Sequence, residues 1–332
     1  MRFFRRDPKS GGREAIASFW AWWDEARHRV AASIAAGQAG SLVGELSGHV
    51  DAIDRRLAWE LSAGRSSQHA LIVTPEGDPA VRALALEWRA AAPEPDGTWE
   101  YHASRQAGPL GHLAMDGVEI DLSAYRAISS WDENRQRVDV RLWHPTMSSA
   151  PAAASIRAAY LFLDNLLGED GVERWVGTID LLEAETVGRS PDELRAEVER
   201  RSAEASGESW VLAEGDGGLY LVNLAVKPID HPWKHWHVVV TVDRGLEELS
   251  HSTELPELDA AEDRLVEAMT SAESIHLGHV TDRKRRRIHF MCADGDRGRA
   301  VGQAWADQER HFGPRVDVED DPSWSVRSEL GL

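Results

Sequence analysis

The sequence predicts an α+β protein built from two ferredoxin-like modules, each a β-α-β-β-α-β unit with an antiparallel sheet, preceded by additional N-terminal helices. Three observations predict this. The N-terminal apolar residues recur with a helical period, strand-like and helix-like segments alternate after them, and their order is the same in two successive halves. The chain of 332 residues has room for two cores. We expect domains at 1–206 and 207–332, separated by a small polar stretch.

The first fifty residues have the pattern of packed helices. In the stretch FWAWWDEARHRV, Phe19 and Trp23 share one helical face with Ile16 and Val30, which indicates a buried stripe. Trp22 lies at the margin of that stripe and is the one aromatic residue left for binding. A second apolar series with helical spacing follows, from 42 to 57.

The first module then follows as strands and helices with clear boundary signals. Asp78 and Pro79 begin a helix, Gly168 ends one, and Ser190 with Glu193 forms a capping box for another. The expected strands are 69–75, 98–104, 117–125, 137–143 and 173–182.

The second module repeats this order after one extra strand at 218–228. We expect a strand at 235–243, a helix at 259–272, a hairpin of 274–282 with 286–293, a helix at 297–312 and a strand at 314–320. The two halves share no visible sequence repeat, so the prediction concerns architecture alone.

Composition limits the partners. The formal net charge is -19, a field that repels phosphate backbones, disfavours nucleic acid and favours another protein, a basic one above all. Cys292 is the single cysteine, which excludes an internal disulfide. No run of eighteen apolar residues occurs, so we expect a cytoplasmic protein without a membrane partner.

The C-terminal segment carries a resemblance. Gly278, Thr281, Arg287 and Phe290 are followed by the closing pattern Asp-Pro-x-Trp, at Asp321, Pro322 and Trp324. These residues resemble the end of an uncharacterised bacterial domain-of-unknown-function family and, more remotely, the ribonuclease E inhibitor B family of acidic ferredoxin-like proteins. The resemblance covers the last 55 to 60 or so residues. It implies a ferredoxin-like fold and a role in binding another protein. Arg327 replaces the aromatic residue that usually follows in that family.

Few patterns point to catalysis. The sequence contains no GxGxxG, no phosphate-binding loop, no HExxH and no GxSxG, and it implies no cofactor. The strongest candidate is DHPWKHWH, where His231, His235 and His237 have a spacing compatible with metal ligands. The competing interpretation is a set of half-exposed histidines at the start of an edge strand.

Two further groups are candidate binding residues. Arg285, Arg286 and Arg287 belong to a basic run that we interpret first as a solvated hairpin tip and second as a contact for a partner. Trp236, with Phe290, offers aromatic rings to an RNA-binding sheet if both are exposed.

These observations favour a non-enzymatic protein-binding or regulatory module of inhibitor or immunity type, while leaving an enzymatic role open. The alternative is a metal-dependent hydrolase or small-ligand binder that uses His231, His235 and His237.

Overall fold

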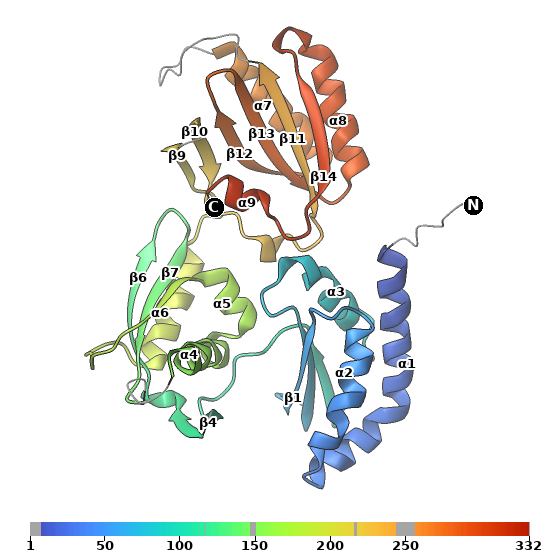
Figure 1. Cartoon of the computed structure of the whole chain (residues 1–332), viewed down its shortest axis with the longest axis vertical. Helices are drawn as coiled ribbons and strands as arrows, with labels where there is room; N and C mark the ends of the chain where they lie inside the picture. The colour runs from blue at the N-terminus through green and yellow to red at the C-terminus, as the bar shows by residue number, and fades with distance from the viewer. Residues whose placement is uncertain (1–7, 116, 147–150, 216–217, 244–255, 332) are drawn as a thin grey trace. The chain divides into compact units, whose positions relative to one another are not determined.

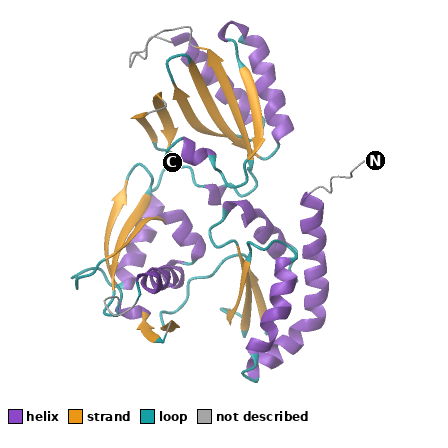
Figure 2. Cartoon of the chain, viewed as in Figure 1, coloured by secondary structure: helices purple, strands orange, loops and turns teal. Residues whose placement is uncertain are grey.

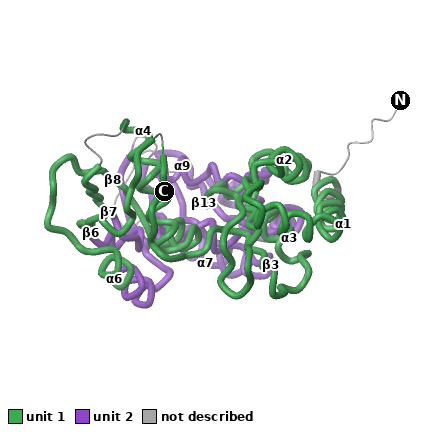
Figure 3. Tube along the Cα trace, turned by 90° about the horizontal axis from the view of Figure 1, so that it is seen from below, with its two compact units in different colours: residues 1–128, 140–196 green, residues 129–139, 197–332 purple. Residues whose placement is uncertain are grey.

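The computed structural model describes residues 8–115, 117–146, 151–215, 218–243 and 256–331. It has a mixed α+β architecture (Figures 1 and 2). The chain divides into two compact units, residues 1–128 with 140–196 and residues 129–139 with 197–332 (Figure 3). No helix in the described ranges has the length and apolar character that crossing a bilayer requires.

The first unit begins with helices packed on a three-stranded sheet of order β1-β2-β3. The predicted stripe is confirmed, because Phe19, Trp23 and Val30 are fully buried in this core. Asp78 caps the next helix by accepting a hydrogen bond from the Ala80 amide at 2.9 Å. The elements are α1 (Pro8–Ala35), η1 (Ala39–Leu42), α2 (Val43–Asp51), β1 (Ala58–Ala63), β2 (His69–Thr74), α3 (Pro79–Ala90) and β3 (Trp99–His102).

The remainder of the first unit holds a hairpin, a second three-stranded sheet and three helices. Gly168, with φ +77, separates two of these helices, and Ser190 and Glu193 form the predicted capping box. The elements are β4 (His112–Met115), β5 (Val118–Asp121), η2 (Leu122–Ala124), β6 (Arg126–Asp132), β7 (Arg137–Trp143), α4 (Ala152–Leu167), α5 (Glu169–Trp175), β8 (Val176–Leu181) and α6 (Pro191–Glu204). The division into units assigns the tip of the β6–β7 hairpin and the end of α6 to the second unit.

The expectation of one ferredoxin-like antiparallel sheet in the first half is not confirmed. Its strands divide among the sheets β1-β2-β3, β4-β5 and β6-β7-β8, and β3 pairs with β2 in parallel. The apolar series at 42–57 is helical only as far as Asp51, and the β1 strand follows at Ala58. Antiparallel pairing with β2, the next strand along the chain, stabilises the extended conformation of β1.

The second unit is organised around a six-stranded antiparallel sheet of order β14-β11-β13-β12-β10-β9. Residues 236–320 run strand, helix, strand, strand, helix, strand, as the sequence predicts. The elements are β9 (Trp210–Gly215), β10 (Gly218–Asn223), η3 (Pro228–Asp230), β11 (Trp236–Asp243), α7 (Pro256–Thr270), β12 (Ile275–Thr281), β13 (Arg285–Cys292), α8 (Gly295–Gln308), η4 (Arg310–Phe312), β14 (Arg315–Asp320) and α9 (Val326–Glu329).

The two faces of this sheet are covered differently. Helices α7 and α8 pack on one face of the sheet (Figure 1). On this face Val238, Ile288 and Phe290 form one core with Leu265 of α7 and Trp305 of α8. We call this the helix side. The other face carries a smaller core, which the C-terminal segment with α9 helps to form. Its buried members are Val222, Val226, Leu277, Val280, Met291, Trp324, Val326 and Leu330.

The two edges of the sheet also differ. β14 forms one edge and exposes the carboxylates of Asp317, Glu319 and Asp320. β9 forms the other edge and exposes Trp210 and Leu212. No described strand pairs with the outer side of either edge.

Candidate functional site

The histidines predicted as metal ligands have separate sets of partners. His235 Nδ1 lies 2.6 Å from Asp320 Oδ1, and His237 Nδ1 lies 2.8 Å from Glu319 Oε1. His231 stacks on Trp324, with ring centroids 6.2 Å apart. Within the described ranges, no three or more His, Cys, Asp or Glu side chains are grouped so that they hold a metal ion. The metal hypothesis for these histidines therefore stays a prediction.

A hydrogen-bonded chain connects His237 to a second buried histidine. His237 Nε2 lies 3.0 Å from His289 Nδ1, and the two rings are nearly parallel. Burial lowers the pKa of His289 to about 3, so this imidazole is neutral at physiological pH. A carboxylate oxygen accepts hydrogen bonds, so His237 Nδ1 is the donor toward Glu319. His289 Nε2 is buried without a hydrogen-bond partner.

The basic run does not form one surface. Asp282 Oδ1 accepts hydrogen bonds from the Lys284 and Arg285 amides and closes the turn between β12 and β13. The Arg285 side chain lies 3.5 Å from Asp243 on the neighbouring strand. The exposed members of the run at this turn match the interpretation as a hairpin tip.

Arg286 and Arg287 point to opposite faces of the sheet because they are consecutive in a strand. Arg286 is buried on the helix side, where its Nη1 donates to Asp259 Oδ1 at 2.7 Å and to Glu262 Oε2 at 2.8 Å. Arg287 stands opposite Thr241 in the register with β11, and its Nε is buried without a partner. Arg286 and Arg287 therefore do not extend the exposed basic surface of the hairpin tip on one face.

The predicted binding tryptophans are both engaged in packing. Trp22 Nε1 donates to Glu45 Oε1 at 2.9 Å, and its ring stacks on His49 at 4.0 Å between centroids. Trp236 fills the space beside Gly295, where a Cβ atom would lie 2.7 Å from the indole. Phe290 is fully buried on the helix side, so the aromatic pair needed for an RNA-binding sheet is not exposed.

An exposed apolar strip lies on β9 and β10. Trp210 is 42% exposed and Leu212 is 64% exposed, and Leu212 stands opposite Leu221 of β10 in the strand register. Leu219, two residues before Leu221, shares its face and is also partly exposed. We define the apolar strip as Trp210, Leu212, Leu219 and Leu221.

The strip faces the helix side of the sheet. Leu221 stands opposite His279 of β12, and His279 Nδ1 lies 2.6 Å from Glu262 Oε1 of α7. None of the four strip residues belongs to the core that α7 and α8 form with the sheet. The helices therefore cover β11, β13 and part of β12 and leave the last two strands uncovered.

His276 lines the strip at its inner end. Its ring centroid lies 5.1 Å from that of Trp210 and 5.0 Å from that of Phe290. A β-bulge between His276 and Gly278 turns His276 to the helix side. Gly278 has φ +136, and a Cβ atom there would lie 2.2 Å from the Leu221 carbonyl oxygen. Burial lowers the pKa of His276 to about 4, and its Nε2 has no hydrogen-bond partner.

Carboxylates border the apolar strip. Glu214 continues the row of Trp210 and Leu212 along β9 and is exposed. On α7, Asp259, which pairs with Arg286, and Asp263, one turn later, are exposed as well. The strip is an apolar surface with an acidic rim.

Sequence reasoning missed this strip, because it predicted no strand between the small polar stretch at 202–209 and the strand at 218–228. The segment WVLAEG contains the signal that was available: Trp210 and Leu212 alternate with smaller side chains, and Glu214 takes the next position.

Comparisons with known proteins add little. No family model matches the chain, and no curated protein matches it. A crystal structure of a protein from Thermus thermophilus is similar at 8% sequence identity, over 85% of this chain and 38% of that chain, with a TM-score of 0.17. The chain thus spans about two fifths of that protein's length, and a TM-score this low assigns no shared fold.

Proposed function

We propose that this chain is a non-enzymatic protein-binding module that receives a basic amphipathic helix of another protein on its apolar strip. The observation that supports the proposal is the exposure of Trp210 and Leu212 on an edge strand whose outer side pairs with no described strand. Natural sheets protect their edges with charges, prolines or bulges, so large apolar side chains at a free edge indicate a surface that is covered in a complex.

The dimensions of the strip favour a helix as the occupant. Neighbouring strands lie about 4.8 Å apart, so β9 and β10 offer a width of about 10 Å, which is the diameter of one helix. Two helices already pack on the same face of this sheet, and a third beside α7 would continue the layer. The strip residues lie on alternate strand positions and present one continuous apolar ridge.

The charge of the rim favours a basic occupant. Glu214 on one border, with Asp259 and Asp263 on the other, places carboxylates where the flanks of a docked helix would lie. Lysine and arginine side chains on those flanks complement the rim, and the net charge of -19 accelerates the approach of a cationic partner.

We also propose that residues 236–320 form a ferredoxin-like module. The strand order β14-β11-β13-β12, its antiparallel pairing, and the position of α7 and α8 on one face support a ferredoxin-like module over residues 236–320. The resemblance of the C-terminal segment to the ribonuclease E inhibitor B family has the same implication. We propose a cytoplasmic location for such a module.

A synthetic peptide tests the proposed function. A helix of about 14 residues is about 21 Å long, which matches the length of a six-residue strand. The probe carries a leucine stripe flanked by lysines, and a matched probe carries glutamates in their place. We expect the full chain to bind the lysine probe at least 10-fold more tightly than the glutamate probe in calorimetry.

Matched variants locate the binding site. Leu212→Asp should abolish binding of the lysine probe, whereas Val187→Asp, which alters an exposed apolar residue of the first unit, should leave it unchanged. Equal binding by the two variants would overturn the proposal. Size-exclusion chromatography provides a second test: a dimer that Leu212→Asp dissociates would show that a second copy of the chain occupies the strip.

A further inference from the structure

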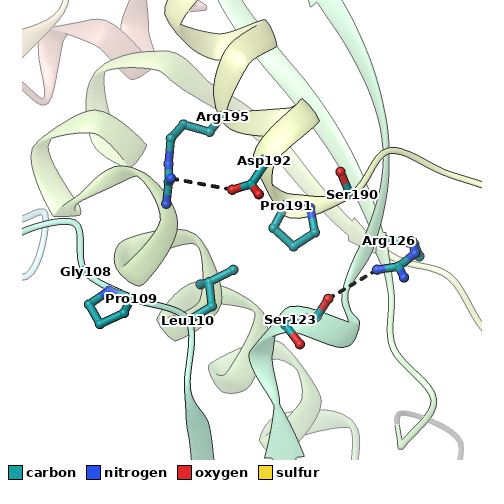
Figure 4. Close-up of a pocket in the computed structure, with 9 residues that line it drawn as sticks. All are labelled: Gly108, Pro109, Leu110, Ser123, Arg126, Ser190, Pro191, Asp192 and Arg195. Atoms are coloured by element: carbon teal, nitrogen blue, oxygen red, sulfur yellow. Dashed lines mark hydrogen bonds and ion pairs between the residues drawn. The ribbon is translucent and has the colours of Figure 1, made fainter.

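A separate cavity lies entirely within the first unit. Its volume is about 600 Å³, within the range of small-molecule sites. It is formed where the start of α6 meets the η2 turn and the chain that precedes β4 (Figure 4). The lining residues are Gly108, Pro109, Leu110, Ser123, Arg126, Ser190, Pro191, Asp192 and Arg195.

Two arginines of this cavity are held in place by neutral partners. Arg126 Nη1 donates to the carbonyl oxygens of Ser123 at 3.2 Å and Tyr125 at 2.7 Å. Arg195 Nε donates to the Leu166 carbonyl oxygen at 3.1 Å. Carbonyl oxygens orient a guanidinium group without neutralising its charge. These carbonyl contacts leave further guanidinium donors on both side chains for a ligand.

Nearby carboxylates do not fill the cavity. Asp192 lies 3.6 Å from Arg195 Nη1, but its side chain is 91% exposed, and solvent weakens such a contact. Glu193 Oε2 accepts hydrogen bonds from the Ser190 amide and hydroxyl at 2.7 and 2.9 Å. Because this carboxylate caps α6, and because Pro191 has no amide hydrogen, the helix start does not supply the anion-binding groups. The arginines supply them.

Apolar side chains lie between the two charges. Figure 4 shows Arg126 and Arg195 on opposite sides of Leu110 and Pro191, with Pro109 beside Leu110. A ligand that spans the cavity thus meets a cation at each end and apolar side chains between them, with the exposed Asp192 carboxylate beside Arg195.

We propose that this cavity binds a small organic dianion, namely a dicarboxylate whose two carboxylates pair with Arg126 and Arg195 and whose short methylene chain lies on Leu110 and Pro191. Arginine matches the planar geometry of a carboxylate and forms two hydrogen bonds with it. The site belongs to the first unit and is independent of the apolar strip.

Calorimetry with adipate, hexanoate and inorganic phosphate tests the proposal on the full chain. Hexanoate has the same number of carbons as adipate with one carboxylate fewer, and phosphate lacks the apolar body. We expect adipate to bind at least 10-fold more tightly than either. Equal affinities for adipate and hexanoate, or no saturable adipate binding below about 10 mM, would overturn the proposal.

Variants place the ligand in the cavity. Arg126→Gln and Arg195→Gln should each weaken adipate binding about 10-fold. Arg200→Gln is the control, because Arg200 lies on the same helix outside the cavity and pairs with Glu197 and Glu204. Leu110→Trp keeps both arginines and fills the cavity, so it should also abolish binding. Adipate binding that Leu110→Trp leaves intact would exclude this cavity, whatever the arginine variants do to folding.

Discussion

Arg105 and Asp164 of the first unit lie close together without a hydrogen bond. Asp164 Oδ2 is 3.7 Å from Arg105 Nη1, whereas Arg105 Nε and Nη2 donate to Glu60 at 2.9 Å and to Glu76 at 2.8 Å. Glu169 is a fourth carboxylate around this guanidinium group, at 3.8 Å from Nη1. One guanidinium group therefore lies among four carboxylates, and it donates hydrogen bonds to Glu60 and Glu76 but not to Asp164 or Glu169.

This arrangement makes Asp164 a source of pH-dependent stability. Burial, together with the neighbouring Glu169, raises the pKa of Asp164 to about 7. Since the unfolded chain ionises this group near pH 4, the folded state holds the extra proton between about pH 4 and pH 7. The free energy of unfolding should therefore fall as pH rises through that window and stay low above it.

Asp164→Asn removes this titration. Relative to the wild type, the variant should gain stability progressively from about pH 4 to pH 7 and keep a gain of about 1–3 kcal/mol at pH 8. Urea unfolding at pH 4.5, 6 and 8 measures the difference. Asp24→Asn, at a side chain that is 84% exposed, is the control. A gain for Asp164→Asn that does not vary with pH would contradict the assignment.

Glu100 should behave in the opposite way. It is buried, and burial by itself opposes ionisation. The carboxylate also accepts hydrogen bonds from the Arg65 amide, from His102 and from the Ser66 amide and hydroxyl. These hydrogen bonds outweigh burial and hold the pKa of Glu100 well below its usual range. The stability that this carboxylate contributes is complete above about pH 5 and is lost as pH falls below that. Glu100→Gln places an amide group among these donors and should cost about 2–4 kcal/mol at pH 7. Thermal unfolding measures the loss, with Glu87→Gln, at a less buried glutamate, as the control. A loss below about 1 kcal/mol would show that the loop with Arg65 and Ser66 does not need the negative charge of Glu100.

Glycines in two helices should respond oppositely to alanine. A Cβ atom at Gly298 of α8 would lie 2.8 Å from Cys292 Sγ and 2.9 Å from a Val238 methyl carbon, so Gly298→Ala should destabilise the second unit by about 1–3 kcal/mol. At Gly48 of α2 a Cβ atom meets nothing within 4 Å, and Gly48→Ala should stabilise the first unit by about 1 kcal/mol. Denaturant unfolding of both variants measures the contrast. Stabilisation by Gly298→Ala would mean that α8 packs less closely on the sheet.

The histidine partners predict the outcome of metal analysis. A metal ion bound by His235 and His237 would have to replace the bonds to Asp320, Glu319 and His289. We therefore expect less than about 0.1 equivalent of zinc, nickel or manganese in the dialysed protein. One equivalent that is lost in His237→Ala would instead establish the metal site that the sequence spacing suggests.

Local signals in the sequence predicted the parts of the fold that local forces determine. The stripe of Phe19 and Trp23 follows from helical periodicity, and the caps at Asp78 and Ser190 follow from side-chain hydrogen bonds within a few residues. The β1 strand was missed because helical spacing continues to Leu57, directly before Ala58, whereas the strand is stabilised by its pairing with β2.

The sites depend on pairings that no local pattern encodes. The apolar strip requires β9 to be the edge of the sheet, and that position follows from the whole strand order. The cavity brings Leu110 and Arg126 together with Arg195, and nothing in their sequence spacing links them. The histidine spacing at 231–237 was visible in the sequence. The residues that contact these imidazole rings come from β13, β14 and the C-terminal segment, which the spacing does not reveal.

The unlike edges of the six-stranded sheet govern how copies of this chain meet. An apolar β9 edge that met the β14 edge of another copy would form a head-to-tail contact, and such contacts propagate into open filaments. The carboxylates of Asp317, Glu319 and Asp320 along β14 oppose this, because Glu214 on β9 would approach them with the same charge. The charge of the β14 edge thus disfavours head-to-tail pairing between copies of this chain.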